Sequence, residues 1–156
     1  MTETSRMNEE QIAEAINSAF PQGITSIEVA PRRIFLTISK DILLDLCKKL
    51  KNELGFEHVS CSCGVDMKTH FQVVHHISSY QNKVVAEIVV DNISKDKPEV
   101  DSITPLWGGA NWHERETYDM FGIIFVGHPK LERLLMADDF QFFPLRKDFN
   151  PGRRVS

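Results

Sequence analysis

Two groups of residues in the 156-residue sequence have the side-chain types that metal sites and acid–base catalysis use. The first contains His58, Cys61, Cys63 and His70. On a strand, the C-x-C spacing would place both thiols on one face and His58 on the other, whereas zinc sites usually take C-x2-4-C pairs from turns. We therefore expect small buried cysteines and solvated histidines here, with a metal site as the less favoured alternative.

The second group contains His113 and Glu116, which would share one face of a helix and could ligate a metal or form an acid–base pair. No second ligand cluster accompanies them, so a stand-alone metal-dependent enzyme would rest on two residues. The sequence has no G-x-S-x-G motif, phosphate-binding glycine loop or dinucleotide motif. Gly108 and Gly109 could hold an anion before a helix, but a tight turn that lets a neighbouring backbone approach is the simpler interpretation.

Composition indicates one soluble globular domain, with 42% hydrophobic and 26% charged residues. The net charge of -4 argues against general nucleic-acid binding. No apolar stretch is long enough to span a bilayer, so we expect membrane association only through a partner. Three cysteines are an odd number, typical of a reduced intracellular chain, and are too few for a four-thiolate iron–sulfur cluster.

Hydrophobic periodicity predicts helices after Asn8, which can form a capping box with Gln11, and over 40–54, where Cys47 falls on the buried stripe. Strands are expected over 24–30, 33–38, 56–65, 70–78 and 84–90.

This order predicts an α+β fold: a two-layer domain with a mostly antiparallel or mixed sheet of about five strands and helices on one face. A short helix and an extended C-terminal arm would follow. The expected boundaries are 1–122 for the domain and 123–156 for a partner-docking arm, with 91–99 as an exposed connection.

The short helix should begin at Asn111, capped together with Glu114, and end at Gly122 in a left-handed conformation. Arg115 and Asp119 are four positions apart and can pair along it. We predict that these two residues and Glu116 form a hydrogen-bonded cluster that loses its water only in an assembly.

Apolar and aromatic residues without a regular period follow this helix, broken by Pro129 and Pro144. Such a segment should lie on another surface. Its basic end interleaves charges with aromatic anchors, which is typical of a docking arm. The residues concerned are Phe142, Phe143, Leu145, Arg146, Lys147, Phe149, Arg153 and Arg154.

The run GANWHERETYDMFGIIFVGHPKLERLLMADDF, followed by PLRKDF, resembles the signature of the C-subunit family of complex I. Its members occur in NADH:quinone oxidoreductases, in photosynthetic NAD(P)H-quinone oxidoreductases, where the corresponding protein is called J, and in archaeal dehydrogenases of reduced deazaflavin coenzyme. Related subunits occur in membrane-bound hydrogenases. Met136-Ala137 departs from the Leu-Pro common in the family, as does the segment 140–143.

The resemblance implies a non-catalytic scaffold in the peripheral arm of a respiratory complex that passes electrons to a quinone or phenazine and translocates ions. It implies no cofactor in this chain, flavin and iron–sulfur clusters in partner subunits, and an inactive isolated chain. The implied partners are the large quinone-site subunit and the iron–sulfur subunits, at the cytoplasmic face of the membrane or the matrix or stromal side in organelles. The electron donor stays open.

The predicted partner interface combines the motif positions with the basic aromatic end. It consists of Trp112, Glu114, Arg115, Glu116, Tyr118, Asp119, Phe121, His128, Pro129, Arg133, Leu145, Arg146, Lys147, Asp148 and Phe149. No catalytic, cofactor-binding or metal-binding residue is predicted.

Overall fold

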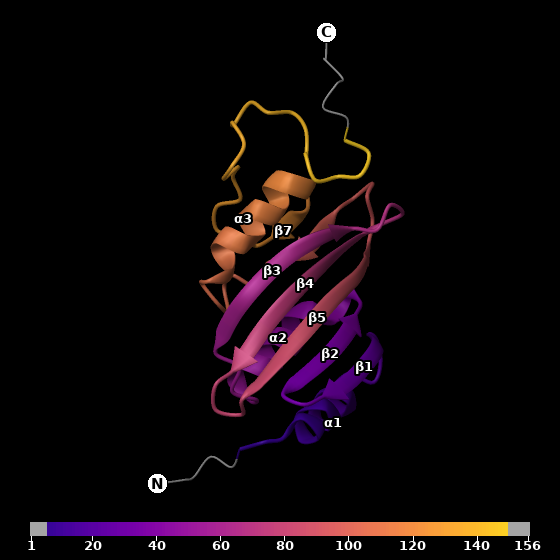
Figure 1. Cartoon of the computed structure of the whole chain (residues 1–156), viewed down its shortest axis with the longest axis vertical. Helices are drawn as coiled ribbons and strands as arrows, with labels where there is room; N and C mark the ends of the chain where they lie inside the picture. The colour runs from indigo at the N-terminus through magenta and orange to yellow at the C-terminus, as the bar shows by residue number, and fades with distance from the viewer. Residues whose placement is uncertain (1–5, 150–156) are drawn as a thin grey trace.

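A five-stranded mixed sheet forms the centre of the fold (Figure 1). The computed structural model describes residues 6–149. In chain order the elements are α1 (Glu9–Ala19), β1 (Ile24–Ala30), β2 (Arg33–Ile38), the 3₁₀ turn η1 (Lys40–Ile42), α2 (Leu43–Asn52), β3 (His58–Asp66), β4 (Phe71–Ser79), β5 (Val84–Ile93), β6 (Glu99–Asp101), α3 (Ala110–Phe121) and β7 (Ile124–Val126).

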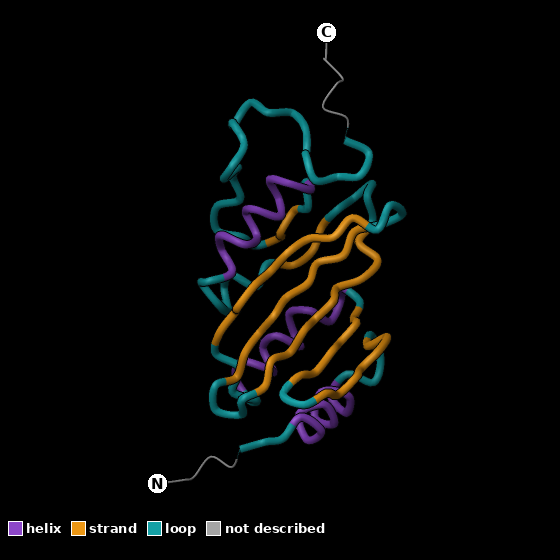
Figure 2. Tube along the Cα trace, in the orientation of Figure 1, coloured by secondary structure: helices purple, strands orange, loops and turns teal. Residues whose placement is uncertain are grey.

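The strand order β1-β2-β5-β4-β3 confirms the predicted α+β fold. Strands β2 and β5 are parallel, in a register that places Leu36 beside Ile88, and the other neighbours are antiparallel. Helix α2 lies behind the sheet in Figures 1 and 2, and α1 lies at the lower ends of β1 and β2. The two helices bury Ile12, Ile16 and Leu46 in the same core as these strand residues.

The first helix begins as predicted, because the Asn8 side chain accepts from the Gln11 N–H and Gln11 accepts from the Asn8 N–H. The predicted second helix instead starts as the turn η1, and Ser39 makes no side-chain capping bond. Cys47 is fully buried, as expected. Burial and the nearby Glu114 raise the pKa of its thiol, so Cys47 is a core residue.

The prediction that Cys61 and Cys63 are buried is wrong: both thiols are exposed. A bulge between Val59 and Cys61 shifts the register of β3. One extra residue reverses which side chains face the core. Ser62 therefore lies on the core side, hydrogen-bonded to the buried His75.

A second, small sheet was not predicted. Strands β6 and β7 pair in parallel, with Val100 beside Phe125, and both of these side chains are buried. The expected exposed connection at 91–99 is shorter than predicted, because β5 continues to Ile93. Three-residue strands are too short to show an alternating pattern. This pairing fixes the two ends of α3 relative to each other.

Residues 127–149, here called the arm, contain no helix or strand and pass over the C-terminal end of α3 (Figure 1). The predicted arm began four residues earlier, in the region that forms β7. Arg153 and Arg154 lie outside the described residues.

Candidate partner interface

Helix α3 begins without the predicted cap. Its first residue is Ala110, the preceding Gly109 makes no side-chain bond, and Asn111 lies inside the first turn. The Oδ1 atom of Asn111 is buried and has no hydrogen-bond partner among the described residues. Gly122 ends the helix with φ +77°, which confirms the predicted left-handed residue.

Glu114 points into the fold instead of reaching back to Asn111. Its carboxylate accepts hydrogen bonds from Ser102 Oγ at 2.5 Å, the Ile103 N–H at 2.7 Å and Thr104 Oγ1 at 2.9 Å. Burial raises the pKa of Glu114, and these three donors partly oppose that effect. Glu114 therefore fastens the loop after β6 to α3.

His128 begins the arm and packs against the same end of α3. Its Nδ1 accepts from the Lys130 N–H at 3.0 Å, which leaves the ring proton on Nε2. That atom lies 3.3 Å from the Asn111 carbonyl and 4.0 Å from Glu114. His128 therefore anchors the start of the arm to the first turn of α3.

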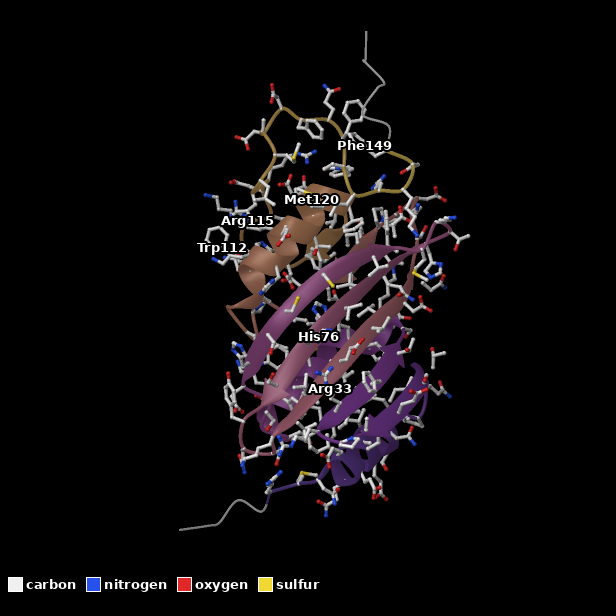
Figure 3. The ribbon with its side chains drawn as sticks, viewed as in Figure 1. Arg33, His76, Trp112, Arg115, Met120 and Phe149 are labelled. Atoms are coloured by element: carbon white, nitrogen blue, oxygen red, sulfur yellow. The ribbon has the colours of Figure 1, made fainter. Side chains whose placement is uncertain are left out.

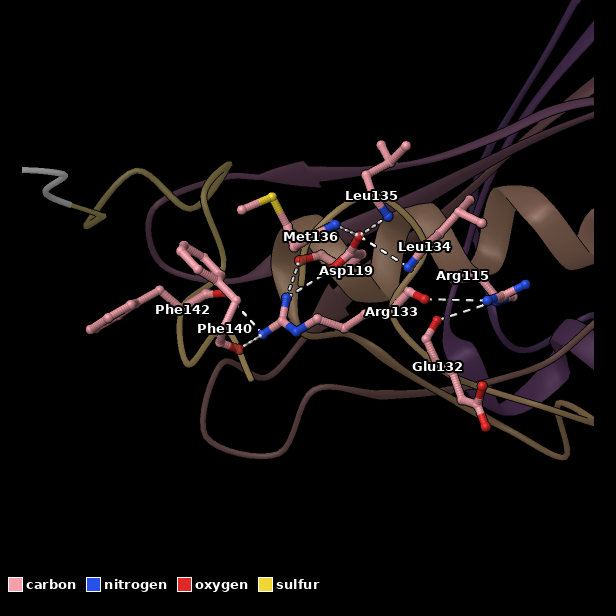
Figure 4. Close-up of polar contacts among 9 residues, drawn as sticks. All are labelled: Arg115, Asp119, Glu132, Arg133, Leu134, Leu135, Met136, Phe140 and Phe142. Atoms are coloured by element: carbon pink, nitrogen blue, oxygen red, sulfur yellow. Dashed lines mark hydrogen bonds and ion pairs between the residues drawn. The ribbon is translucent and has the colours of Figure 1, made fainter. Parts of the chain in front are cut away.

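Asp119 organises the middle of the arm (Figure 4). One carboxylate oxygen lies 2.8 Å from Arg133 Nη1, and the other accepts from the backbone N–H groups of Leu134, Leu135 and Met136. Burial alone would raise the pKa of Asp119, but the guanidinium and the three amides lower it below its usual range.

The predicted cluster of Arg115, Glu116 and Asp119 does not form in the chain. Arg115 instead donates to the carbonyl groups of Glu132 and Arg133, at 3.2 Å each, and lies over the Trp112 ring. Asp119 is fully buried without any partner chain, so the prediction that it loses water only in an assembly is wrong. The i,i+4 spacing permits the pair, but Arg133 offers Asp119 a better-placed guanidinium.

Two arginines hold the rest of the arm. Arg133 Nη2 donates to the carbonyl groups of Phe140, at 2.6 Å, and Phe142, at 3.0 Å. Arg146 Nε donates to the Phe121 carbonyl at 2.6 Å, and its guanidinium lies over the rings of Phe71 and Phe143. The described arm is thus attached to its own domain.

The end of the arm is held by Asp66, a contact that was not predicted from the sequence. Its carboxylate accepts from the Lys147 N–H at 2.8 Å and pairs with Lys95 at 2.8 Å. Burial acts to raise the pKa of Asp66, but Lys95 and the backbone donors lower it to about 2. A polar residue in a predicted turn between strands gave no signal for a contact so distant in sequence.

The predicted interface residues separate into buried and outward-facing sets. Glu114, Asp119 and Phe121 are buried, and Tyr118 packs edge-on against Phe143. Trp112 is 58% exposed, and Figure 3 shows it with Arg115 on the outer side of α3. The predicted positions that are exposed are Trp112, Glu116, Pro129, Leu145, Lys147 and Asp148, while Arg115, His128, Arg133, Arg146 and Phe149 are partly covered.

Of the residues first considered for metal binding, His58 and His70 make other contacts, while Cys61, Cys63, His113 and Glu116 line one groove between α3 and β3. His70 bonds to Asp91 at 2.9 Å, and His58 stacks on Tyr80. No group of three or more His, Cys, Asp or Glu side chains in the described part of the chain is placed to hold a metal ion. Between residues 6 and 149, no helix is long and apolar enough to cross a membrane.

Comparison with known proteins gives one consistent result. Residues 36–155 match the family described as the respiratory-chain NADH dehydrogenase 30 kDa subunit. The chain is 36% identical over 147 residues to the C subunit of the F(420)H(2) dehydrogenase of Methanosarcina mazei, covering 92% of each chain. It is 42% identical over 144 residues to the C subunit of the NADH-quinone oxidoreductase of a Roseiflexus species, covering 88% of this chain and 76% of the relative.

Solved structures agree on the fold. A trypsin-resistant fragment of Nqo5 superposes with a TM-score of 0.66 at 26% identity, over 78% of this chain and 98% of the fragment. A chain of an archaeal membrane-bound sulfane sulfur reductase superposes with a TM-score of 0.75 at 24% identity, over 91% of this chain and 85% of that one, which shows the fold alone. The chain belongs to the family of the respiratory-chain NADH dehydrogenase 30 kDa subunit, that is, the C-subunit family of complex I.

Proposed function

We propose that this chain is a non-catalytic scaffold subunit in the peripheral arm of a complex I-like, ion-translocating oxidoreductase. One observation carries the proposal: the charged residues of the signature fix α3 and the arm to the domain. Glu114 holds the loop after β6, while Asp119 and Arg133 hold the arm. The result is a rigid surface from which Trp112 and Leu135 protrude, at 58% and 64% exposure.

The hydrogen bonds of the charged residues Glu114, Arg115 and Asp119 support a structural role. A general acid or base must reach a substrate. Glu114 and Asp119 are fully buried and occupied by several donors each, and Arg115 is bonded to two arm carbonyls. The proposed complex carries its flavin and iron–sulfur clusters in other subunits, and the isolated chain transfers no electrons.

The proposed partners are the large quinone-site subunit and the cluster-bearing subunits of the same complex. Contact with the membrane goes through them, and the chain lies on the cytoplasmic side or its organellar equivalent. Aromatic and arginine side chains dominate the energetics of many interfaces, which fits the Trp112–Arg115 pair on α3. The proposal covers NADH, NAD(P)H or reduced deazaflavin coenzyme as donors and a quinone or phenazine as acceptor.

The alternative is the corresponding subunit of a membrane-bound hydrogenase. It would share the fold and the interface but not the electron donor.

Gentle purification of the tagged chain from its native cells tests the proposal. We expect it to copurify in fixed stoichiometry with cluster-bearing subunits and donor-dependent quinone or phenazine reductase activity, or with hydrogen-oxidising activity under the alternative. Purification of the chain alone, or turnover by the isolated chain with stoichiometric bound metal, would contradict a scaffold role.

A further inference from the structure

Among the charged residues of α3, Glu116 is the one that does not bond to another segment of the described chain. Its neighbours Glu114, Arg115 and Asp119 all bond to other segments of the chain. Within residues 6–149, by contrast, the exposed Glu116 carboxylate has no hydrogen bond or ion pair. The contacts of residues 6–149 therefore give Glu116 no structural role.

The Glu116 side chain borders a groove between α3 and the edge strand β3. The groove has a volume of about 320 Å³. Residues 61–64 of β3 form one wall, His113, Glu116 and Met120 lie on the α3 side, and Leu145 of the arm also lines it.

The formal charge in this groove is negative. Glu116 is the formally charged residue of its lining, which contains no lysine or arginine among the described residues. Burial and the neighbouring Cys61 raise the pKa of the Cys63 thiol, and Glu87 and Glu116 raise it further. Two carboxylates, Glu87 and Glu116, therefore lie near enough to act on the Cys63 thiol.

The rest of the groove lining is mostly apolar, and part of it is exposed. Leu145 is 55% exposed, and Cys61 and Cys63 are exposed beside it. A carboxylate next to bare apolar surface fits an interface in which the partner supplies both an apolar surface and the opposite charge. Surface of this kind is a poor match for a small anionic ligand or a nucleic acid.

We propose that this groove binds an apolar segment of a neighbouring subunit whose Lys or Arg side chain pairs with Glu116. The inference rests on the proposed function, because it requires the chain to be assembled with other subunits. To the proposed function it adds the position of one subunit contact and the chemistry of the partner segment that binds in the groove.

The two groove thiols provide a direct test of occupancy, with the buried Cys47 as an internal control. N-ethylmaleimide should modify Cys61 and Cys63 in the isolated chain, and at least about tenfold more slowly in the purified complex, where the segment covers them. Cys47 should stay unmodified in both. Equal rates for Cys61 and Cys63 in the free and assembled chain would overturn the proposal, while failure of the wild-type chain to assemble at all would instead contradict the proposed function.

The charge is tested by Glu116→Lys and Glu116→Gln, with Glu14→Lys as the matched control, since Glu14 is an exposed glutamate of helix α1. Loss of one member of a desolvated charge pair weakens binding by at least about tenfold. We expect Glu116→Lys to lose at least this much affinity for the complex, Glu116→Gln to lose less, and Glu14→Lys to assemble like the wild type. All three should keep the wild-type melting temperature. Normal assembly of Glu116→Lys would overturn the pairing.

Discussion

The Asp119 carboxylate lies 2.8 Å from the Arg133 guanidinium, a contact that joins α3 to the arm across 14 positions of sequence. Both side chains are buried almost completely, with exposures of 0% and 9%. The same carboxylate receives three consecutive backbone N–H groups of the arm. This one residue therefore fixes the middle of the arm to α3.

Replacing Asp119 with Ala should lower the free energy of unfolding by about 3–5 kcal/mol, because it leaves the Arg133 charge buried without its partner. Urea unfolding of the isolated chain measures this change. The control is Asp138→Ala, an exposed carboxylate of the arm, whose effect should stay within about 0.5 kcal/mol. Equal losses for the two variants would contradict the assigned role of Asp119.

Acid should weaken the fold through Asp66. Its folded-state pKa of about 2 is below the ordinary value, so its stabilisation is complete above about pH 5 and is lost as the pH falls towards 2. The contribution is roughly 2 kcal/mol. Unfolding measured across this range should show a smaller pH dependence in Asp66→Asn than in the wild type.

Glu114 should change the stability of the fold with pH in the opposite direction to Asp66. Its raised pKa adds stability when the group is protonated, and this contribution is lost as the pH rises through the folded-state value.

For Asp66, identical pH dependence in the wild type and Asp66→Asn would show that Lys95 and the Lys147 N–H do not hold its carboxylate.

Two glycines near the ends of α3 should respond differently to alanine. At Gly122, φ is +77°, and an added Cβ would lie 2.7 Å from the Phe143 ring and 2.8 Å from Arg146. Gly122→Ala should therefore destabilise the chain by at least about 1 kcal/mol and displace the arm. Gly109 has φ −62° and no atom within 4 Å of the added Cβ, so Gly109→Ala should be neutral or stabilising in thermal unfolding.

Trp112 should matter for assembly and not for folding. It is 58% exposed in the chain, so Trp112→Ala should leave the melting temperature nearly unchanged while weakening assembly by about 2 kcal/mol or more. Tyr80→Ala is the control, because Tyr80 is 65% exposed in the turn between β4 and β5. Retention of each variant in the purified complex provides the measurement, and equal retention would remove Trp112 from the interface.

Local features of the fold were predicted well from sequence because they depend on neighbouring residues. The Asn8 capping box and strands β1 and β2 match their predicted bounds. The bulge in β3 was not predicted, since nothing at Ser60 distinguishes an extra residue from a paired one. Glu114 and Asp119 were identified as important, but with the wrong partners: Ser102 and Arg133 lie in segments without any periodic pattern, and only the folded chain brings them to α3.

The most direct test of the scaffold assignment is to remove this chain from its native cells and then restore it. Donor-dependent quinone or phenazine reduction, or hydrogen oxidation under the alternative, should disappear with the assembled complex. It should return when the wild-type chain is restored. Activity that persists in an assembled complex without this chain, or activity of the purified chain by itself, would contradict the account.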